Sequence, residues 1–177
     1  MQFSLTREQK RLRERVRTFG EREIEPVAAA CERSGEVPLD VIERAAEAGF
    51  VGSTIPEEYG GPGRSMLESA IVTEELWRAD TGVGWAIGLS GFAGNVYGLD
   101  RYGDEWMKAE WFPKIAAGDL LDGTAVTEPT AGSDVASLET TATRDGDEWV
   151  VDGEKKFVGN GSIADYLVTA AKTDPGE

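Results

Sequence analysis

The spacing of apolar residues changes near Leu120 to Gly123, and this change constrains the fold more than any other feature of the chain. Before it, apolar residues recur with the spacing of one helix face; after it, they alternate and β-branched residues become frequent, as in strands. Helices followed by strands, rather than the two interleaved, are typical of the α+β class. We therefore expect an all-helical domain over residues 1–120 and a β-domain over residues 121–177.

Start and stop signals divide the first part of the chain into five predicted helices, with a reversal at the glycine- and proline-rich residues 55–63. The helices are Thr6–Ala30, which Pro26 can kink, a second opened by Pro38, Ser65–Arg78, Gly82–Leu99, and one capped by Asp104 that runs to Ala117. The charge-free stretch Val83–Val96 should be buried in the bundle or line an apolar ligand channel. The last helix should carry Trp106, Trp111 and Phe112 inward.

The β-domain is predicted to hold five strands in an antiparallel arrangement. Asp145-Gly146 is a strong hairpin signal between two of them. The predicted strands are Thr124–Thr127, Leu138–Arg144, Glu148–Asp152, Lys155–Val158 and Tyr166–Lys172. Five strands without a closing partner leave an exposed edge that complete domains normally cover. We therefore expect the chain to end inside its β-domain.

Charge and residue usage exclude several classes of function. The net charge of −15, from 33 acidic and 18 basic residues, argues against a nucleic acid or an anionic membrane surface as partner. No histidine occurs, which excludes Ser-His and Cys-His nucleophile pairs and the commonest zinc sites. Cys31 is the only cysteine, so no intrachain disulfide or thiolate cluster can form. The N-terminus has no signal-peptide pattern, and no apolar window is long enough for a membrane span, so we expect a cytoplasmic protein.

Two segments have the composition of ligand-binding loops. Val126–Asp134 combines hydroxyls, a proline and a glycine between a predicted strand and a predicted hairpin. Gly153–Gly161 follows about twenty residues later and ends in the same loop chemistry. The two loops can face one ligand, although a purely structural turn remains an alternative for the first of them.

The first loop lacks basic side chains, because no Lys or Arg occurs between Ile115 and Thr143. A phosphate bound there would be held by backbone N–H groups and by the hydroxyls of Thr127 and Ser133, with Gly132 allowing close approach. This chemistry suits a ring system attached to a diphosphate better than a nucleoside triphosphate, which calls for a lysine and a metal ion.

Three motifs carry a resemblance to a known family. Val126–Asp134 resembles the V-T-E-P-x-A-G-S-D signature of the acyl-CoA dehydrogenase family, and Ile55–Gly61 is similar to that family's P-E-E-Y-G-G turn. Gly153–Gly161 is similar to its G-x-K-x-W-I-T/S-N-G strand. The motifs occur in family order and span most of the chain.

The resemblance implies a helical N-terminal domain, a β-barrel-like middle domain and a second helical domain, which together enclose FAD beside an acyl-CoA thioester. In that family a carboxylate removes the α-proton while the β-hydride goes to the flavin. The positions that the resemblance assigns to FAD are Thr124, Ala125, Val126, Thr127, Gly132, Ser133, Phe157, Val158 and Gly159. Ser133 is also expected to touch the acyl-CoA substrate.

This chain departs from the family pattern at three positions of the two loops. Thr130 stands where small or turn-favouring residues are frequent, so the loop must avoid a positive φ at this β-branched residue. Phe157 replaces the usual Trp and keeps the apolar face without the indole N–H. Gly159 replaces the usual Thr or Ser, whose hydroxyl would serve the flavin, and resembles the pattern of some short-chain acyl-CoA oxidases and related dehydrogenases.

The resemblance places the catalytic carboxylate in the C-terminal helical domain, so we assign no catalytic residue and no metal ligand to this chain. Glu128 is expected to brace its own turn. The sequence therefore predicts the N-terminal portion of an FAD-dependent acyl-CoA dehydrogenase of fatty acid metabolism, with an electron acceptor flavoprotein as partner and a homo-oligomeric full-length form. The alternatives are a non-catalytic remnant or interaction module of that family, and a short-chain acyl-CoA oxidase.

Overall fold

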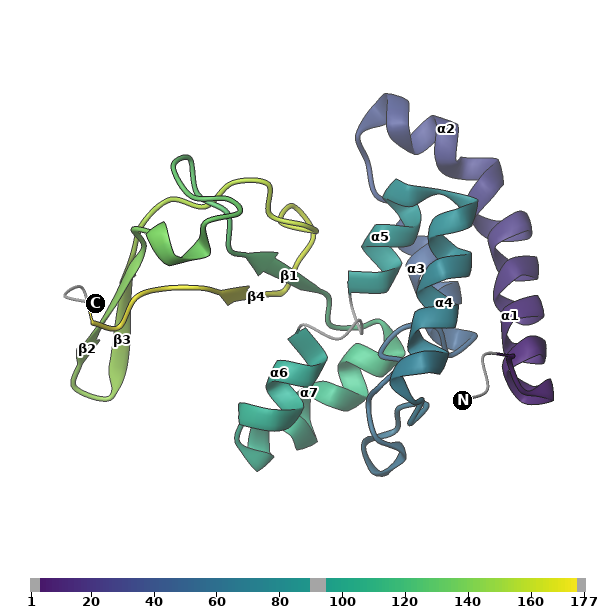
Figure 1. The fold of residues 1–177 in the computed structure, drawn as a ribbon, viewed down its shortest axis with the longest axis horizontal. Coiled ribbons are helices and arrows are strands. Elements are labelled where there is room, and N and C mark those ends of the chain that lie inside the picture. Colours follow the sequence, from purple (N-terminus) through teal and green to yellow (C-terminus); the bar gives the residue numbers. More distant parts are fainter. Residues whose placement is uncertain (1–3, 90–94, 175–177) are drawn as a thin grey trace. The chain divides into compact units, whose positions relative to one another are not determined.

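The computed structural model describes residues 4–89 and 95–174. The chain divides into two compact units, the helical unit Met1–Leu121 and the β unit Asp122–Glu177 (Figure 1). Helices make up the first unit and a few short strands the second, so the predicted α+β class is confirmed. None of the helices in the described ranges combines the length and apolar character needed to cross a bilayer.

Over residues 4–89 and 95–121, the helical unit contains seven α-helices. They are α1 (Arg7–Phe19), α2 (Glu25–Ser34), α3 (Leu39–Glu47), α4 (Met66–Ala79), α5 (Thr81–Leu89), α6 (Asn95–Tyr102) and α7 (Glu105–Ala117). Capping boxes open two of them, because Thr6 and Ser65 each accept a hydrogen bond from the backbone three residues on and are bonded in return. α4 packs against both α1 and α5 and forms the centre of the unit.

The first predicted helix is two α-helices joined by a π-helical turn, η1 (Gly20–Ile24). Pro26 explains the interruption, because it lacks an N–H and its ring clashes with the carbonyl of the residue four positions earlier. The interruption that was predicted as a kink at Pro26 is thus a π-helical turn. The predicted end at Ala30 is wrong, since α2 continues to Ser34 and stops at Gly35 in the left-handed conformation.

The charge-free stretch that was predicted as part of one helix spans α5 and α6. Val83, Ala86 and Ile87 are buried in the bundle, as expected. Trp85 is 43% exposed, so burial in the bundle does not hold for this side chain. Residues 90–94 of the predicted helix lie outside the described residues.

Helix α7 carries one of its three large aromatic residues fully inward. Phe112 is completely buried, and Tyr59 of the P-E-E-Y-G-G turn packs edge-on against it with ring centroids 5.3 Å apart. Trp111 is half-buried, and Trp106 is 59% exposed, so the inward prediction for Trp106 is wrong. At 3.6 residues per turn Trp106 stands about 180° around the helix from the buried Ile115.

Four strands form two separate pairs in the β unit: β1 (Asp122–Ala125), β2 (Thr141–Asp145), β3 (Glu148–Asp152) and β4 (Tyr166–Thr169). β2 and β3 form the predicted antiparallel hairpin. β1 and β4 pair in parallel, which corrects the expected antiparallel arrangement. The reason is the long connection over residues 126–165, which acts as a crossover and returns the chain in the same direction.

The predicted strand Lys155–Val158 does not form. Phe157 has a φ of 57°, in the left-handed region, and this interrupts the extended backbone. An isolated antiparallel bridge between Gly159 and Thr124 remains.

Candidate functional site

The two loops predicted to face one ligand run side by side in the β unit. Thr124 bridges to Gly159 in antiparallel orientation, and the Lys156 N–H donates to the Thr127 carbonyl at 2.8 Å. Thr127 lies three residues after Thr124, and Lys156 lies three residues before Gly159. The bridge and the hydrogen bond therefore have the same antiparallel register. We call residues 124–128 and 155–159 the paired segments.

Seven of the nine predicted ligand positions belong to the paired segments, and the structure brings them together. Ala125 is buried, whereas Thr124, Val126, Thr127, Val158 and Gly159 are half-buried and Phe157 is exposed. Gly132 and Ser133 lie on the exposed turn that follows. Within the described residues neither of these two hydrogen-bonds to the paired segments.

The exposed turn offers polar groups and free space. In the part of the chain that the structure describes, no heavy atom lies within 4 Å of the position that a Cβ on Gly132 would take. In the ranges that the structure describes, the hydroxyls of Thr127 and Ser133 have no hydrogen-bond partner. Thr130 is not among the residues with positive φ, as expected for a β-branched side chain. The turn can therefore accept a ligand without first breaking an internal contact.

Phe157 stands out from the paired segments as an exposed aromatic side chain. It is 84% exposed, and its φ of 57° is costly for a bulky residue. The Lys156 ammonium lies 4.8 Å from the centroid of its ring. An apolar ring that is held in solvent by a strained backbone can cover a flat ligand.

The buried side chain of Glu128 holds the first loop in place through hydrogen bonds. Its carboxylate is 3% exposed and accepts hydrogen bonds from Lys155 Nζ at 2.7 Å, from the Thr140 hydroxyl at 2.5 Å and from two backbone N–H groups, of Glu139 and Thr140. The Lys155 ammonium, followed by the hydroxyl and backbone donors, lowers the pKa of Glu128 from its ordinary 4.5 to about 2. A structural role for Glu128 is therefore observed, but not the predicted brace of its own turn. The carboxylate joins the first loop to the residues before β2 and to the second loop.

Sequence reasoning missed three residues that support this anchor. Lys155 also donates to the Val126 carbonyl at 3.0 Å, and a Cβ on Gly153 would stand only 2.3 Å from the Thr140 hydroxyl. The sequence offers one signal for Lys155: it lies in the second ligand-loop motif, Gly153–Gly161, and no Lys or Arg of the first loop is available to neutralise Glu128.

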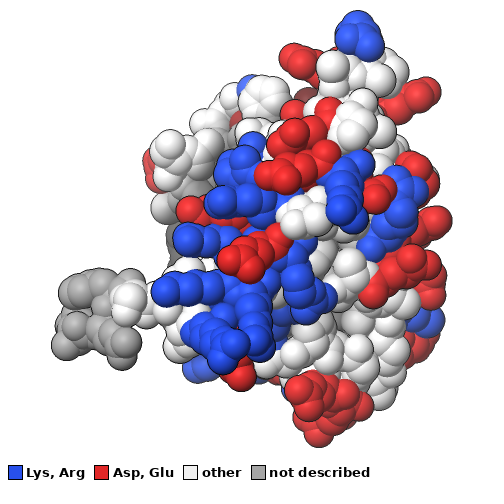
Figure 2. Space-filling model, turned by 90° about the vertical axis from the view of Figure 1, so that its right-hand side faces the viewer, with Lys and Arg blue, Asp and Glu red and all other residues white. Residues whose placement is uncertain are grey.

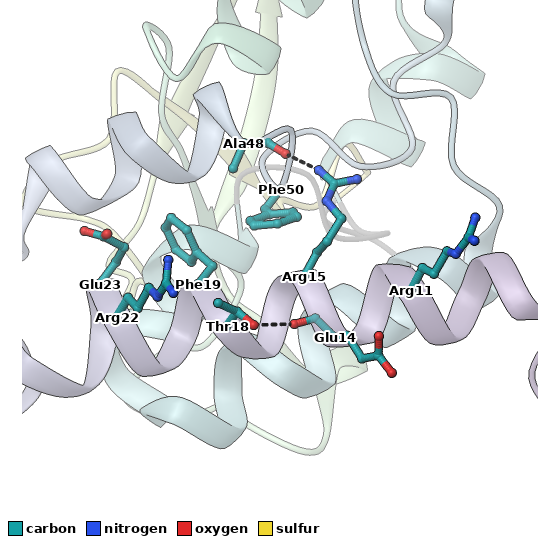
Figure 3. A pocket seen from close by; sticks show the side chains of 9 residues that line it. All are labelled: Arg11, Glu14, Arg15, Thr18, Phe19, Arg22, Glu23, Ala48 and Phe50. Atoms are coloured by element: carbon teal, nitrogen blue, oxygen red, sulfur yellow. Dashed lines mark hydrogen bonds between the residues drawn. The ribbon is translucent and has the colours of Figure 1, made fainter.

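The helical unit holds a second candidate surface, a groove of about 610 Å³ beside α1 (Figure 3). Its floor is an edge-to-face pair of Phe19 and Phe50, with ring centroids 5.3 Å apart. Three arginines and two glutamates line it: Arg11, Arg15, Arg22, Glu14 and Glu23. Figure 2 shows Lys and Arg gathered over this face of the molecule, although the chain as a whole is acidic.

Comparison with family models identifies both units. The acyl-CoA dehydrogenase N-terminal domain matches residues 6–119, and the acyl-CoA dehydrogenase middle domain matches residues 123–177. The chain belongs to the acyl-CoA dehydrogenase family.

Curated relatives agree with this assignment. The chain is 37% identical over 175 residues to the probable acyl-CoA dehydrogenase YngJ of Bacillus subtilis, with 98% of this chain and 45% of the relative covered. It is 36% identical over 177 residues to the glutaryl-CoA dehydrogenase of Desulfococcus multivorans, with the same coverage. The chain thus spans about 45% of the length of these acyl-CoA dehydrogenases.

Solved structures of the family have the same fold. The glutaryl-CoA complex of a glutaryl-CoA dehydrogenase superposes with a TM-score of 0.91 at 35% identity, covering 99% of this chain and 45% of that one. A Mycobacterium smegmatis glutaryl-CoA dehydrogenase with FADH2 gives 0.89 at 29% identity, covering 96% and 44%. A chain from a study of the electron transferring flavoprotein of Acidaminococcus fermentans gives 0.87 at 32% identity, covering 99% and 46%.

Proposed function

We propose that this chain supplies FAD- and acyl-CoA-binding surface to an FAD-dependent acyl-CoA dehydrogenase that introduces a Cα–Cβ double bond into an acyl-CoA thioester. The observation that carries the proposal is the in-register pairing of the two family motifs, which leaves Phe157 exposed beside them. FAD, when bound, would supply the hydride acceptor for this reaction.

The residues present suit this cofactor. The backbone of residues 124–127 and the free Thr127 hydroxyl would hold the polar edge of a flavin ring, and Phe157 would cover its face. The open space at Gly132 and the free Ser133 hydroxyl suit a diphosphate on a turn without basic residues, and Ser133 would also contact acyl-CoA. Val158 and Gly159 would complete the second wall. The FADH2 and glutaryl-CoA complexes of relatives support both ligands.

Glu128 is unsuited to proton abstraction. A general base works best when its pKa lies near the operating pH, whereas four hydrogen bonds hold the pKa of Glu128 at about 2. We therefore propose that Glu128 shapes the site and that no residue of this chain acts as the catalytic base.

The partner that we propose is an electron acceptor flavoprotein, and the α1 groove is its contact surface. The aromatic floor offers an apolar anchor point, and the arginines favour an acidic segment. Arg11→Glu should raise the KM for the flavoprotein acceptor several-fold at low salt and leave turnover with a small dye acceptor unchanged. The matched control is Arg33→Glu on α2; an equal effect of the two substitutions would remove the groove from the proposal.

We also propose that the enzyme serves fatty acid metabolism in the cytoplasm as a homo-oligomer. The single cysteine, Cys31, suits a reducing compartment. Native mass spectrometry of the protein purified from its host would report the number of copies.

The function is tested with the protein at its native length. We expect one flavin per chain by absorbance and bleaching of the flavin band by acyl-CoA under anaerobic conditions. Thr127→Val should weaken FAD binding about tenfold through the lost hydrogen bond, whereas the control Thr143→Val on β2 should not.

Two experimental outcomes would indicate a different function. A protein without flavin and without acyl-CoA-dependent bleaching would be a non-catalytic member of the family. Rapid peroxide release in air would indicate an acyl-CoA oxidase, an activity that Gly159 favours because the hydroxyl expected at that position is missing.

A further inference from the structure

The paired segments are not held together by a continuous strand ladder. Thr124 and Gly159 form an isolated bridge, and the backbone between them is interrupted at Phe157. Few apolar side chains of the β unit are buried, so packing alone gives little support to the pairing. Something else must fix the distance between the two loops and their register.

Lys155 is placed to fix the distance and the register of the two loops. Its ammonium donates to the Glu128 carboxylate at 2.7 Å and to the Val126 carbonyl at 3.0 Å, so that one side chain reaches two positions of the opposite segment. The lysine side chain is 10% exposed and the glutamate side chain 3%, which protects the pair from solvent screening. The backbone N–H of Lys156 adds the bond to Thr127 from the next residue.

Glu128, the acidic partner of this ion pair, is itself fixed by further hydrogen bonds. The Glu128 carboxylate also accepts from Thr140 and from the backbone N–H of Glu139, which lead into β2. The charge on Lys155 therefore acts on a carboxylate whose position is fixed by the next strand. This geometry turns an ion pair into a rigid link between the hairpin and both loops.

We infer that Lys155 is a positioning residue, which sets the register of the two loops through Glu128 and thereby aligns Thr127 and Phe157 for FAD. The inference rests on the proposed function. A positioning role differs from a general contribution to stability. It predicts that the affinity and the absorption spectrum of bound flavin change when the Lys155–Glu128 ion pair is removed from a protein that still folds.

The decisive variant is the double substitution Glu128→Gln with Lys155→Met. It buries no unpaired charge, so it should fold where Lys155→Met alone, which strands the carboxylate, can fail. We expect the double variant to unfold within a few degrees of the unsubstituted protein, to bind FAD at least tenfold more weakly, and to shift the visible absorption band of bound flavin.

Two further variants complete the test. Lys155→Arg keeps the charge and the donors and should recover most of the FAD affinity. Lys172→Met is the matched control, since the Lys172 side chain has no ion pair within residues 4–89 and 95–174, and it should leave affinity and spectrum unchanged.

The outcomes separate the inference from the function on which it rests. If the unsubstituted protein at native length binds no FAD, the proposed function fails. If it binds FAD and the folded double variant binds with the same affinity and spectrum, the function stands and the positioning role of Lys155 is overturned. A double variant that does not fold would also overturn the inference, because the pair would then be required for folding itself.

Discussion

Among the described residues, each unit of the molecule buries one glutamate and neutralises it, but with different partners. Glu75 of α4, 1% exposed, receives two hydrogen bonds of 2.9 Å from Arg17 of α1 and one of 3.0 Å from Arg78. Glu128 of the β unit accepts hydrogen bonds from a lysine ammonium, a hydroxyl and two backbone N–H groups. The first carboxylate joins two helices, whereas the second joins loops.

The surroundings explain what each glutamate does. Around Glu75, α1 and α4 are already packed through fully buried side chains such as Val16, Val72 and Leu76. In the described part of the β unit the buried apolar residues are Ala125, Ala131, Leu138 and Ala142, most of them small. Apolar burial therefore determines the helical unit, and polar contacts determine the shape of the proposed site.

The largest expected effect comes from removing core volume in the helical unit. Phe112→Ala should lower the free energy of unfolding by about 3–5 kcal/mol, because it leaves a cavity beneath Tyr59. Trp106→Ala on the same helix, where the side chain is 59% exposed, should cost about 0.5 kcal/mol. Denaturant unfolding monitored by circular dichroism measures both. Equal losses would contradict the placement of the core.

A smaller effect is expected from crowding the polar anchor of the β unit. Gly153→Ala should cost about 2 kcal/mol, because the new methyl group displaces Thr140 from Glu128. The control is Gly98→Ala in α6, where a Cβ meets no heavy atom of the described residues within 4 Å and should stabilise the helix. Chemical unfolding of the two variants compares the units, and a neutral Gly153→Ala would show that the Thr140 contact is dispensable.

A third effect is a dependence of stability on acid. The pKa of Glu128 is depressed to about 2 when folded, so its stabilisation is complete above its ordinary 4.5 and is lost as the pH falls from 4.5 toward 2. Burial raises the pKa of Glu75, but hydrogen bonds from Arg17 and Arg78 outweigh it and lower the pKa, so the sign is the same.

This prediction is measured by unfolding at about pH 6 and about pH 3. Glu128→Gln should flatten the pH dependence of the β unit and leave that of the helical unit unchanged. Glu75→Gln should do the reverse. A pH dependence that neither variant alters would assign the acid sensitivity to other carboxylates.

The two units also differ in how far the sequence predicts them. Helix starts at Thr6, Pro38, Ser65 and Asp104 follow from local signals, and the structure places helices there because capping and periodicity act over a few residues. The π-helical turn was foreseen only as a kink at Pro26, because the choice between kink and widened turn depends on packing against α4.

In the β unit the motifs predicted that two loops would face each other, but their contacts could not be predicted. The parallel pairing of β1 with β4 depends on how the long connection crosses over. The Lys155–Glu128 link joins residues that are 27 positions apart in sequence. Periodicity and local propensity carry no information about such contacts.

The central claim is that the paired segments and the following turn form the FAD-binding surface. Amide hydrogen exchange of the protein at native length, with and without FAD, tests it most directly. We expect added protection at residues 124–128, 132–133 and 155–159, with α1, α4 and the tip of the β2–β3 hairpin unchanged. Protection confined to the helices or the hairpin, or none in these loops when FAD is bound, would contradict the claim.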